Sequence, residues 1–187
     1  MNANLRSTSA VLGFPRIGPQ REVKKALEAY WGDKISAEEL LKVAKEQRLN
    51  TYATIKEQGV DFVPTGTFSL YDHVLDMSNT LGIIPEAYAT SGLSQLDTYF
   101  AMARGHQKGG VDLPATEMKK WFDSNYHYLV PEFSEKSEFK LNDNKPVDDF
   151  IEAKEAGYNA RPVILGPLTL LWLCLLYTSD AADDSLR

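Results

Sequence analysis

Four basic side chains follow a short apolar segment near the amino terminus and could bind an anion. Residues 10–12 have the pattern of a buried strand, and the glycines and prolines at 13–19 indicate a turn after it. The cations lie in that turn and at the start of a helical pattern: Arg16, Arg21, Lys24 and Lys25. Ligands of parallel α/β proteins lie beyond the carboxyl ends of strands, so this cluster indicates an anionic ligand. A solvated basic helix face is the alternative interpretation.

Histidines and carboxylates elsewhere give weaker signals. His73, His106 and His127 lie in separate segments without the Cys/His spacing of a zinc site, so we predict no metal ligands. Asp72 and His73 would diverge by about 100° on a helix, so we expect Asp72 to cap the following helix instead. Glu132 follows a strand end, where barrel enzymes place catalytic groups, but has no partner carboxylate. We predict no catalytic residue in this chain.

The elements that position these residues alternate between helix and strand. The pair Ser36 and Glu39 has the pattern of a capping box, which predicts a long helix to about residue 58, closed by Gly59. Further helices are expected at 71–81, 96–104 and 147–156, the last with Phe150, Ile151 and Ala153 facing inward, and further short strands at 60–64, 128–131 and 162–165. Residues 82–92 and 105–114 have the composition of irregular loops.

Four strands separated by helices predict βαβ units with right-handed crossovers, in either a barrel or an open doubly wound sheet. The first turn lacks the G-x-G-x-x-G pattern, and the chain has no P-loop. Each unit takes about 40 residues, so an eight-unit barrel would need roughly twice this length. The sequence therefore predicts an α/β protein with four βα units, about half of a barrel.

Bulk properties limit the class of partner and the compartment. A net charge of −6 over 187 residues argues against a nucleic-acid partner. The longest apolar run, 162–177, is interrupted and too short for a membrane helix. The first nine residues are polar and the chain has one cysteine, so we expect a cytoplasmic protein without a signal peptide or internal disulfide.

Several segments resemble one known family, in that family's order. They are Gly13-Phe14-Pro15-Arg16-Ile17-Gly18 with Arg21-Glu22-Val23-Lys24, and residues 68–75, 102–105, 117–132 and 162–167. Together they are similar to the amino-terminal part of cobalamin-independent methionine synthase, the 5-methyltetrahydropteroyltriglutamate–homocysteine methyltransferase. The likeness covers residues 11–173.

The resemblance implies a (β/α)8 TIM-type barrel, of which this chain holds about the first four units. It also implies transfer of a methyl group from 5-methyltetrahydropteroyltri-L-glutamate to homocysteine, which makes methionine. The folate and its polyglutamate tail would contact Arg21, Glu22, Val23, Lys24, Lys120 and Asn125. Guanidinium forks and lysine charges suit a chain of carboxylates. Trp121 and Tyr126 are expected in the core and are left out of this site.

In the family, zinc binds homocysteine as a thiolate, and its ligands lie in the carboxyl-terminal barrel. The resemblance thus implies a fragment that is inactive alone. Two alternatives stay open: a non-catalytic module that binds folate or another anion, and a different (β/α)8 enzyme such as a decarboxylase.

The carboxyl-terminal end has a different character. Residues 174–183 resemble a translated sequencing adapter, and the family likeness stops at Leu173. We therefore expect a partial barrel domain over 1–173 and a non-native tail over 174–187. A divergent natural tail is the alternative.

Overall fold

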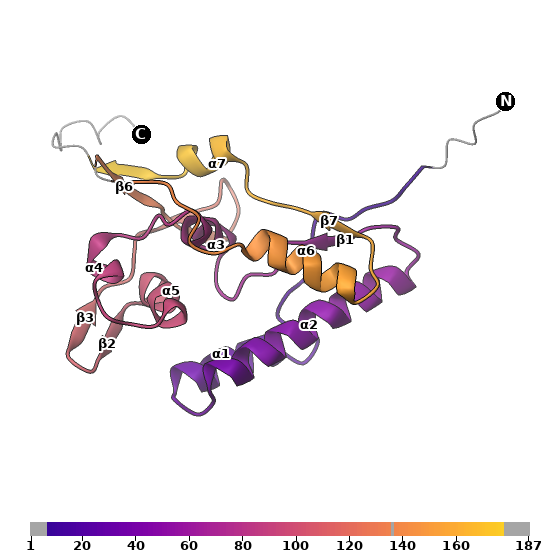
Figure 1. The fold of residues 1–187 in the computed structure, drawn as a ribbon, viewed down its shortest axis with the longest axis horizontal. Helices are drawn as coiled ribbons and strands as arrows, with labels where there is room; N and C mark the ends of the chain where they lie inside the picture. The colour runs from indigo at the N-terminus through magenta and orange to yellow at the C-terminus, as the bar shows by residue number, and fades with distance from the viewer. Residues whose placement is uncertain (1–6, 136, 178–187) are drawn as a thin grey trace. The chain divides into compact units, whose positions relative to one another are not determined.

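The structure is a computed structural model that describes residues 7–135 and 137–177 (Figure 1). The chain divides into two compact units. The first contains the described residues up to Leu70 together with Lys145–Ile164, and the second contains Tyr71–Asn144 and the described residues from Leu165 onward. Most of the predicted non-native tail, residues 178–187, lies outside the described residues.

The first unit combines three helices with one parallel strand pair. Its elements are α1 (Glu22–Trp31), α2 (Ala37–Glu57), β1 (Val63–Thr65), α6 (Lys145–Glu155) and β7 (Ala160–Pro162). Helix α1 packs along α2 (Figure 1), and β1 pairs with β7 so that Val63 lies opposite Ala160. The core consists of Tyr52, Ile55, Val63 and Ala153. Apolar side chains from α2, β1 and α6 therefore hold this unit together.

Helix α2 begins at the predicted capping box. The Ser36 hydroxyl accepts a hydrogen bond from the Glu39 N–H at 3.2 Å, and the Glu39 carboxylate accepts one from the Ser36 N–H at 2.7 Å. Hydrogen bonding of the Glu39 carboxylate, first to the Ser36 backbone and second to the Ser36 side chain, lowers the pKa of Glu39. The helix ends just before Gly59, whose φ of +80° suits glycine. The predicted helix is confirmed.

The second unit contains four helices and three strand pairs among its described residues. The helices are α3 (His73–Thr80), α4 (Glu86–Ala89), α5 (Gln95–Arg104) and α7 (Pro167–Trp172). The strands are β2 (His106–Lys108) with β3 (Val111–Leu113) and β4 (Met118–Lys120) with β5 (His127–Leu129), both antiparallel, and β6 (Glu132–Ser134) with β8 (Leu175–Tyr177), parallel. Its core consists of Val74, Ile83, Tyr128, Val130, Phe133, Leu170 and Leu173.

Three local predictions were wrong. Residues 10–12 form one isolated bridge, Ala10 to Phe62, instead of a buried strand, and Leu12 is 75% exposed. Residues 105–114 form the β2–β3 hairpin, because Gly109 and Gly110 adopt the positive φ that a tight turn requires. Residues 82–92 include one short helix, α4.

The inward face of α6 also differs from the prediction. Ile151 is 46% exposed, whereas Asp149 is buried. Lys145 Nζ donates to Asp149 Oδ2 at 2.7 Å. Arg48 of α2 donates two hydrogen bonds to Glu152 of α6, at 2.7 and 2.9 Å. Paired charges thus occupy part of a face that hydrophobic periodicity assigned to apolar residues.

The sheets do not form a closed barrel within the described residues. Each sheet has two strands, and β1 pairs with β7 rather than with the strand that follows it in the chain. A (β/α)8 barrel pairs consecutive strands in parallel. The structure therefore supports a mixed α/β fold. None of the described helices is long and apolar enough to cross a membrane.

Candidate functional site

The predicted anion-binding residues at the start of α1 are held by a turn that folds back on the helix. Arg21 precedes the helix with a φ of +64°, and its N–H donates to the Gly18 carbonyl at 3.0 Å. The Val23 N–H donates to the Ile17 carbonyl at 3.1 Å. Two bonds from the turn thus fix where the helix begins.

The four predicted residues of this turn have different surroundings. Arg21 and Lys24 are exposed, and Lys24 Nζ lies 3.5 Å from the Glu28 carboxylate in a solvent-exposed pair of small energetic value. Val23 is fully buried, so only its backbone could contact a ligand. The Glu22 carboxylate accepts from the Gln20 N–H at 3.0 Å and supports the turn. Only Arg21 and Lys24 among these four offer a cation to an anionic ligand.

The other two predicted residues lie on the β4–β5 hairpin. Lys120 ends β4 opposite His127, and Asn125 lies in the connecting loop, with both side chains exposed. The Trp121 N–H donates to the Tyr126 carbonyl at 2.7 Å and closes the loop. The hairpin therefore presents Lys120 and Asn125 to solvent from a hydrogen-bonded loop.

A buried carboxylate anchors this hairpin to α3. Asp72 is 1% exposed, and its Oδ2 accepts from the Leu75 N–H at 2.9 Å and from the Leu129 N–H at 3.2 Å. Its Oδ1 accepts from the Tyr126 hydroxyl. The predicted helix cap is confirmed, and the same side chain joins α3 to β5 and to the hairpin loop.

Aromatic side chains surround the exposed edge of this anchor. The His73 ring lies 4.8 Å from Trp121 and 5.6 Å from Tyr126, between ring centroids. Trp121 packs against the second core as expected, but Tyr126 is 38% exposed, so its assignment to the core was wrong. The turn-forming Asp123, Ser124 and Asn125 just before it are the sequence signal that places Tyr126 in a loop.

The structure describes these two groups of residues in separate units. Arg21, Glu22, Val23 and Lys24 come together on the first unit, and Lys120 and Asn125 on the second. Each group is thus a local surface of its own unit.

The part of the chain that the structure describes contains no set of ligands for a metal ion. No group of three His, Cys, Asp or Glu residues there is arranged to hold an ion. The described residues therefore do not fit a zinc ion.

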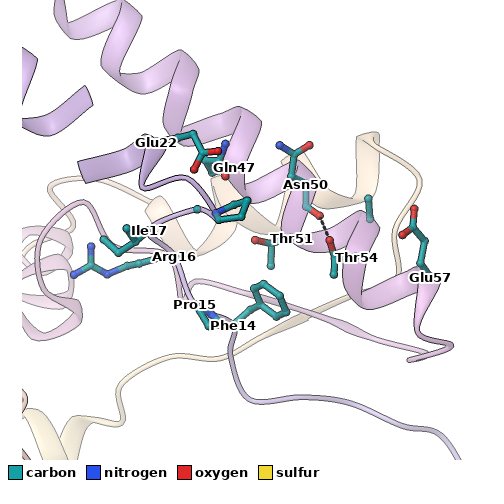
Figure 2. Close-up of a pocket in the computed structure, with 13 residues that line it drawn as sticks. Phe14, Pro15, Arg16, Ile17, Glu22, Gln47, Asn50, Thr51, Thr54 and Glu57 are labelled. Carbon is teal, nitrogen blue, oxygen red and sulfur yellow. Dashed lines mark hydrogen bonds between the residues drawn. The ribbon is translucent and has the colours of Figure 1, made fainter. Parts of the chain in front are cut away.

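A groove of about 590 Å³ lies beside the α1 turn (Figure 2). One side is the segment from Phe14 to Glu22, and the other is a face of α2 that includes Gln47 and Thr51. Sequence reasoning missed this groove because it treated α2 only as an outer helix. The available signal was Gln47, a polar residue at the helical spacing of the buried apolar residues of α2.

Comparisons with known proteins identify the family. Residues 8–186 match the family described as "Cobalamin-independent synthase, N-terminal domain". The chain is 58% identical over 171 residues to a probable 5-methyltetrahydropteroyltriglutamate–homocysteine methyltransferase of Schizosaccharomyces pombe, covering 88% of this chain and 22% of that protein. The enzymes of that name from Saccharomyces cerevisiae and Caulobacter vibrioides are 54% and 51% identical over 171 and 182 residues, covering 88% and 89% of this chain and 22% and 23% of theirs.

This chain spans about a fifth of the length of those relatives. Its likeness to them runs through both compact units. The chain belongs to the cobalamin-independent methionine synthase family and matches the family's amino-terminal domain.

Proposed function

We propose that this chain supplies the donor-binding part of a methyltransferase of methionine biosynthesis. The reaction moves a methyl group from 5-methyltetrahydropteroyltri-L-glutamate to homocysteine. The observation that carries the proposal is the family match over both units, since the relatives reported above bear the name of this reaction. Those names favour it over another (β/α)8 enzyme such as a decarboxylase. The net charge of −6 supports a small-molecule partner rather than a nucleic acid. A cytoplasmic location is part of the same proposal.

The exposed cations give this role a physical basis. Lys24 and Arg21 flank the start of α1, and Lys120 ends β4. A polyglutamate tail repeats a negative charge, so each successive carboxylate can add an attraction to a cation without one fixed geometry. The Asn125 amide adds hydrogen-bond donors, and Glu22 and Val23 act by holding the turn.

Activation of homocysteine requires groups outside this chain under the same proposal. Zinc, when bound in the family's full-length enzymes, lowers the pKa of the thiol and makes it a better nucleophile. Because the described residues do not fit a zinc site, we assign the metal and homocysteine to a separate part of the enzyme. The chain alone should therefore not transfer the methyl group.

The domain boundaries belong to the proposal as well. Residues 1–173 would form about half of a (β/α)8 barrel, for which the match to the family's amino-terminal domain is the support. Residues 174–187 would be a non-native tail. The family match extends to residue 186. Sequencing the genomic copy of the gene tests at which residue the natural sequence differs from this one.

The experiment compares two donors in a full-length protein that carries this sequence. Lys24→Ala and Lys120→Ala should weaken binding of the triglutamate donor more than that of the monoglutamate, as measured by the ratio of the two dissociation constants. A well-formed charge-assisted contact contributes about 1.5 to 3 kcal/mol, and an exposed one about 1 kcal/mol or less, so we expect a change of a few-fold to tenfold.

Lysines outside the proposed contacts provide matched controls. Lys42 is exposed on α2 in the same unit as Lys24, and Lys119 precedes Lys120 on β4, where successive side chains point to opposite faces. Alanine at Lys42 or Lys119 should leave the ratio unchanged. Equal losses for both donors in the Lys24 and Lys120 variants would show that these lysines do not contact the tail. Donor binding without methionine formation by the full-length protein would favour the non-catalytic module.

A further inference from the structure

The loop between β4 and β5 is closed by its own hydrogen bonds. The Trp121 N–H donates to the Tyr126 carbonyl at 2.7 Å, and the Trp121 carbonyl accepts from the Ser124 hydroxyl at 2.6 Å. The Tyr126 N–H donates to the Ser124 hydroxyl at 3.2 Å. Phe122 has a φ of +47°, which a bulky residue rarely adopts, yet it is 66% exposed. Such backbone strain persists where the surrounding structure fixes it, and it is common at ligand-binding sites.

The Tyr126 hydroxyl connects this loop to the start of α3. It donates to Oδ1 of Asp72, the buried residue that caps the helix. His73 Nδ1 lies 3.3 Å from the same hydroxyl, and the His73 and Tyr126 rings stack with their centroids 5.6 Å apart. Because the hydroxyl proton is directed at Asp72, the hydroxyl oxygen can accept a hydrogen bond from the Nδ1–H of His73. One hydroxyl thus joins the loop to two successive residues of another element.

Asn125, a proposed contact of the methyl donor, lies between two residues that are held in place. Its carbonyl is 3.1 Å from His127 Nδ1. A carbonyl oxygen can only accept, so His127 Nδ1 carries the hydrogen of this bond. The next residue in the chain is Tyr126, whose hydroxyl is bound at α3. The backbone on both sides of Asn125 is therefore fixed, while its side chain is exposed.

The Tyr126 hydroxyl is not needed to join the strand to the helix. Asp72 Oδ2 accepts from the Leu75 N–H at 2.9 Å and from the Leu129 N–H at 3.2 Å, so α3 and β5 stay connected without it. Tyr126 is also 38% exposed, so burial of its ring contributes only part of what a core tyrosine would. The hydroxyl therefore acts on the loop that carries Asn125 rather than on the strands of the hairpin.

We propose that Tyr126 is a positioning residue for the methyl donor, an inference that rests on the proposed function. Its hydroxyl, held by Asp72 and His73, keeps Asn125 where the Asn125 amide contacts the donor. A side chain on a fixed backbone loses less conformational entropy when a ligand binds, so the affinity is higher. Tyr126 acts through Asn125 and needs no contact of its own with the donor.

The test measures binding and turnover of the triglutamate donor in a full-length protein that carries this sequence. Tyr126→Phe keeps the ring and removes only the hydroxyl. The Kd and KM for the donor should rise about three- to tenfold, the range for one lost hydrogen bond. The kcat and the KM for homocysteine should not change, because only donor binding is weakened. Tyr88→Phe is the matched control, since that hydroxyl donates to the Pro114 carbonyl at 2.7 Å in the same unit but outside the hairpin.

A double-mutant cycle separates positioning from a general loss of stability. If Tyr126 acts through Asn125, Tyr126→Phe should weaken donor binding by less than about twofold once Asn125→Ala is present, whereas independent residues would give the product of the two losses. Hydrogen exchange at the Trp121 amide should be about three- to tenfold faster in Tyr126→Phe, because the loop opens more often. Exchange at the Leu129 amide should stay at its wild-type rate, because Asp72 still accepts its hydrogen bond.

Four outcomes would overturn the inference. They are wild-type donor affinity in Tyr126→Phe, a loss in the double variant equal to the product of the single losses, an equal loss of donor affinity in Tyr88→Phe, and exchange that accelerates at Leu129 as much as at Trp121. The last two would show that the loss of any hydroxyl, or of the whole hairpin, explains the weaker binding.

A second variant covers the case in which Tyr126→Phe does not fold. His73→Phe then takes its place in the cycle, because it removes one partner of the Tyr126 hydroxyl but keeps a ring beside it. Wild-type affinity in Asn125→Ala would contradict the proposed Asn125 contact and this inference together. A loss in Asn125→Ala without one in Tyr126→Phe would overturn the inference alone and leave the proposed function intact.

Discussion

Removing the Asp72 carboxylate should detach the β4–β5 hairpin from α3. In Asp72→Ala the Leu75 N–H loses its cap, and the Leu129 N–H is left buried without a partner. The Tyr126 hydroxyl can turn to water, because that residue is 38% exposed. The substitution therefore leaves two backbone N–H groups without an acceptor, one at the start of α3 and one in β5.

The expected cost follows from these two donors. Losing an N-cap costs about 1 kcal/mol, and leaving a buried donor unpaired costs about 1 to 3 kcal/mol. The sum for Asp72→Ala is about 2 to 4 kcal/mol. Asp72→Asn keeps one acceptor oxygen, so we expect about half of that cost. Every 1.4 kcal/mol changes an opening equilibrium about tenfold, so the Leu129 amide should exchange with solvent about 30-fold faster or more in Asp72→Ala.

Hydrogen exchange at individual amides is the assay, with Asp123→Ala as the control. Asp123 is an exposed carboxylate in the loop of the same hairpin, and its loss should change stability by less than about 0.5 kcal/mol. Exchange in α2, which belongs to the first unit, should remain at its wild-type rate in both variants. If Leu129 exchanges no faster in Asp72→Ala than in Asp123→Ala, Asp72 does not anchor the hairpin and this reasoning is refuted.

Further predictions concern the first unit, each measured by hydrogen exchange in α2 and β1. Ser36→Ala should cost about 1 kcal/mol because it removes the helix cap. Folding lowers the pKa of Glu39, so its carboxylate should stabilise the fold fully above the pKa of the unfolded state and lose this effect as the pH falls through the pKa of the folded state. An effect of Glu39→Gln that does not depend on pH would contradict this. Thr65→Val should stabilise by up to about 1 kcal/mol, since the buried Thr65 hydroxyl has no partner among the described residues; a loss would reveal one. Gly18→Ala should cost about 1 to 2 kcal/mol at a φ of +86°, and a neutral result would show that the turn relaxes. Genomic sequencing past Leu173 should give a coding sequence that differs from residues 174–187, and a contiguous match would show that the tail is natural.

The sequence predicted the features that depend on local chemistry. The Ser36–Glu39 box, the glycine after α2 and the Asp72 cap are confirmed, because each is a hydrogen bond or a backbone angle set by residues a few positions apart. The family resemblance is confirmed for the same kind of reason, since it rests on contiguous segments quoted directly from the chain.

Features that depend on distant partners were predicted poorly. Residues 10–12 form only one bridge, at Ala10, because pairing depends on a distant segment that the local pattern does not show. Asp149 is buried because Lys145 and Arg48 pair with its charge. The direction of pairing was also not available, so β5 was expected in a parallel sheet although it forms an antiparallel hairpin with β4. Local patterns contain no record of which strand lies alongside.

The same limit applies to the candidate site. Exposed cations at Lys24 and Lys120 could be named from sequence, and the structure locates each on its own element. Tyr126 and Gln47 were missed, because their surroundings come from an anchor at Asp72 and from a turn at Gly18 that lie far from them in the chain.

Methionine formation is the measurement that tests the central claim most directly. A full-length protein encoded by the gene that contains this sequence, and the 187-residue chain alone, are each supplied with zinc, homocysteine and 5-methyltetrahydropteroyltri-L-glutamate, and their mass is measured by light scattering. We predict steady methionine formation by the full-length protein, none by the chain alone, and self-association of the chain through exposed apolar side chains such as Leu168 and Trp172. Turnover by a monomer of the chain, or none by a folded full-length protein, would contradict the account.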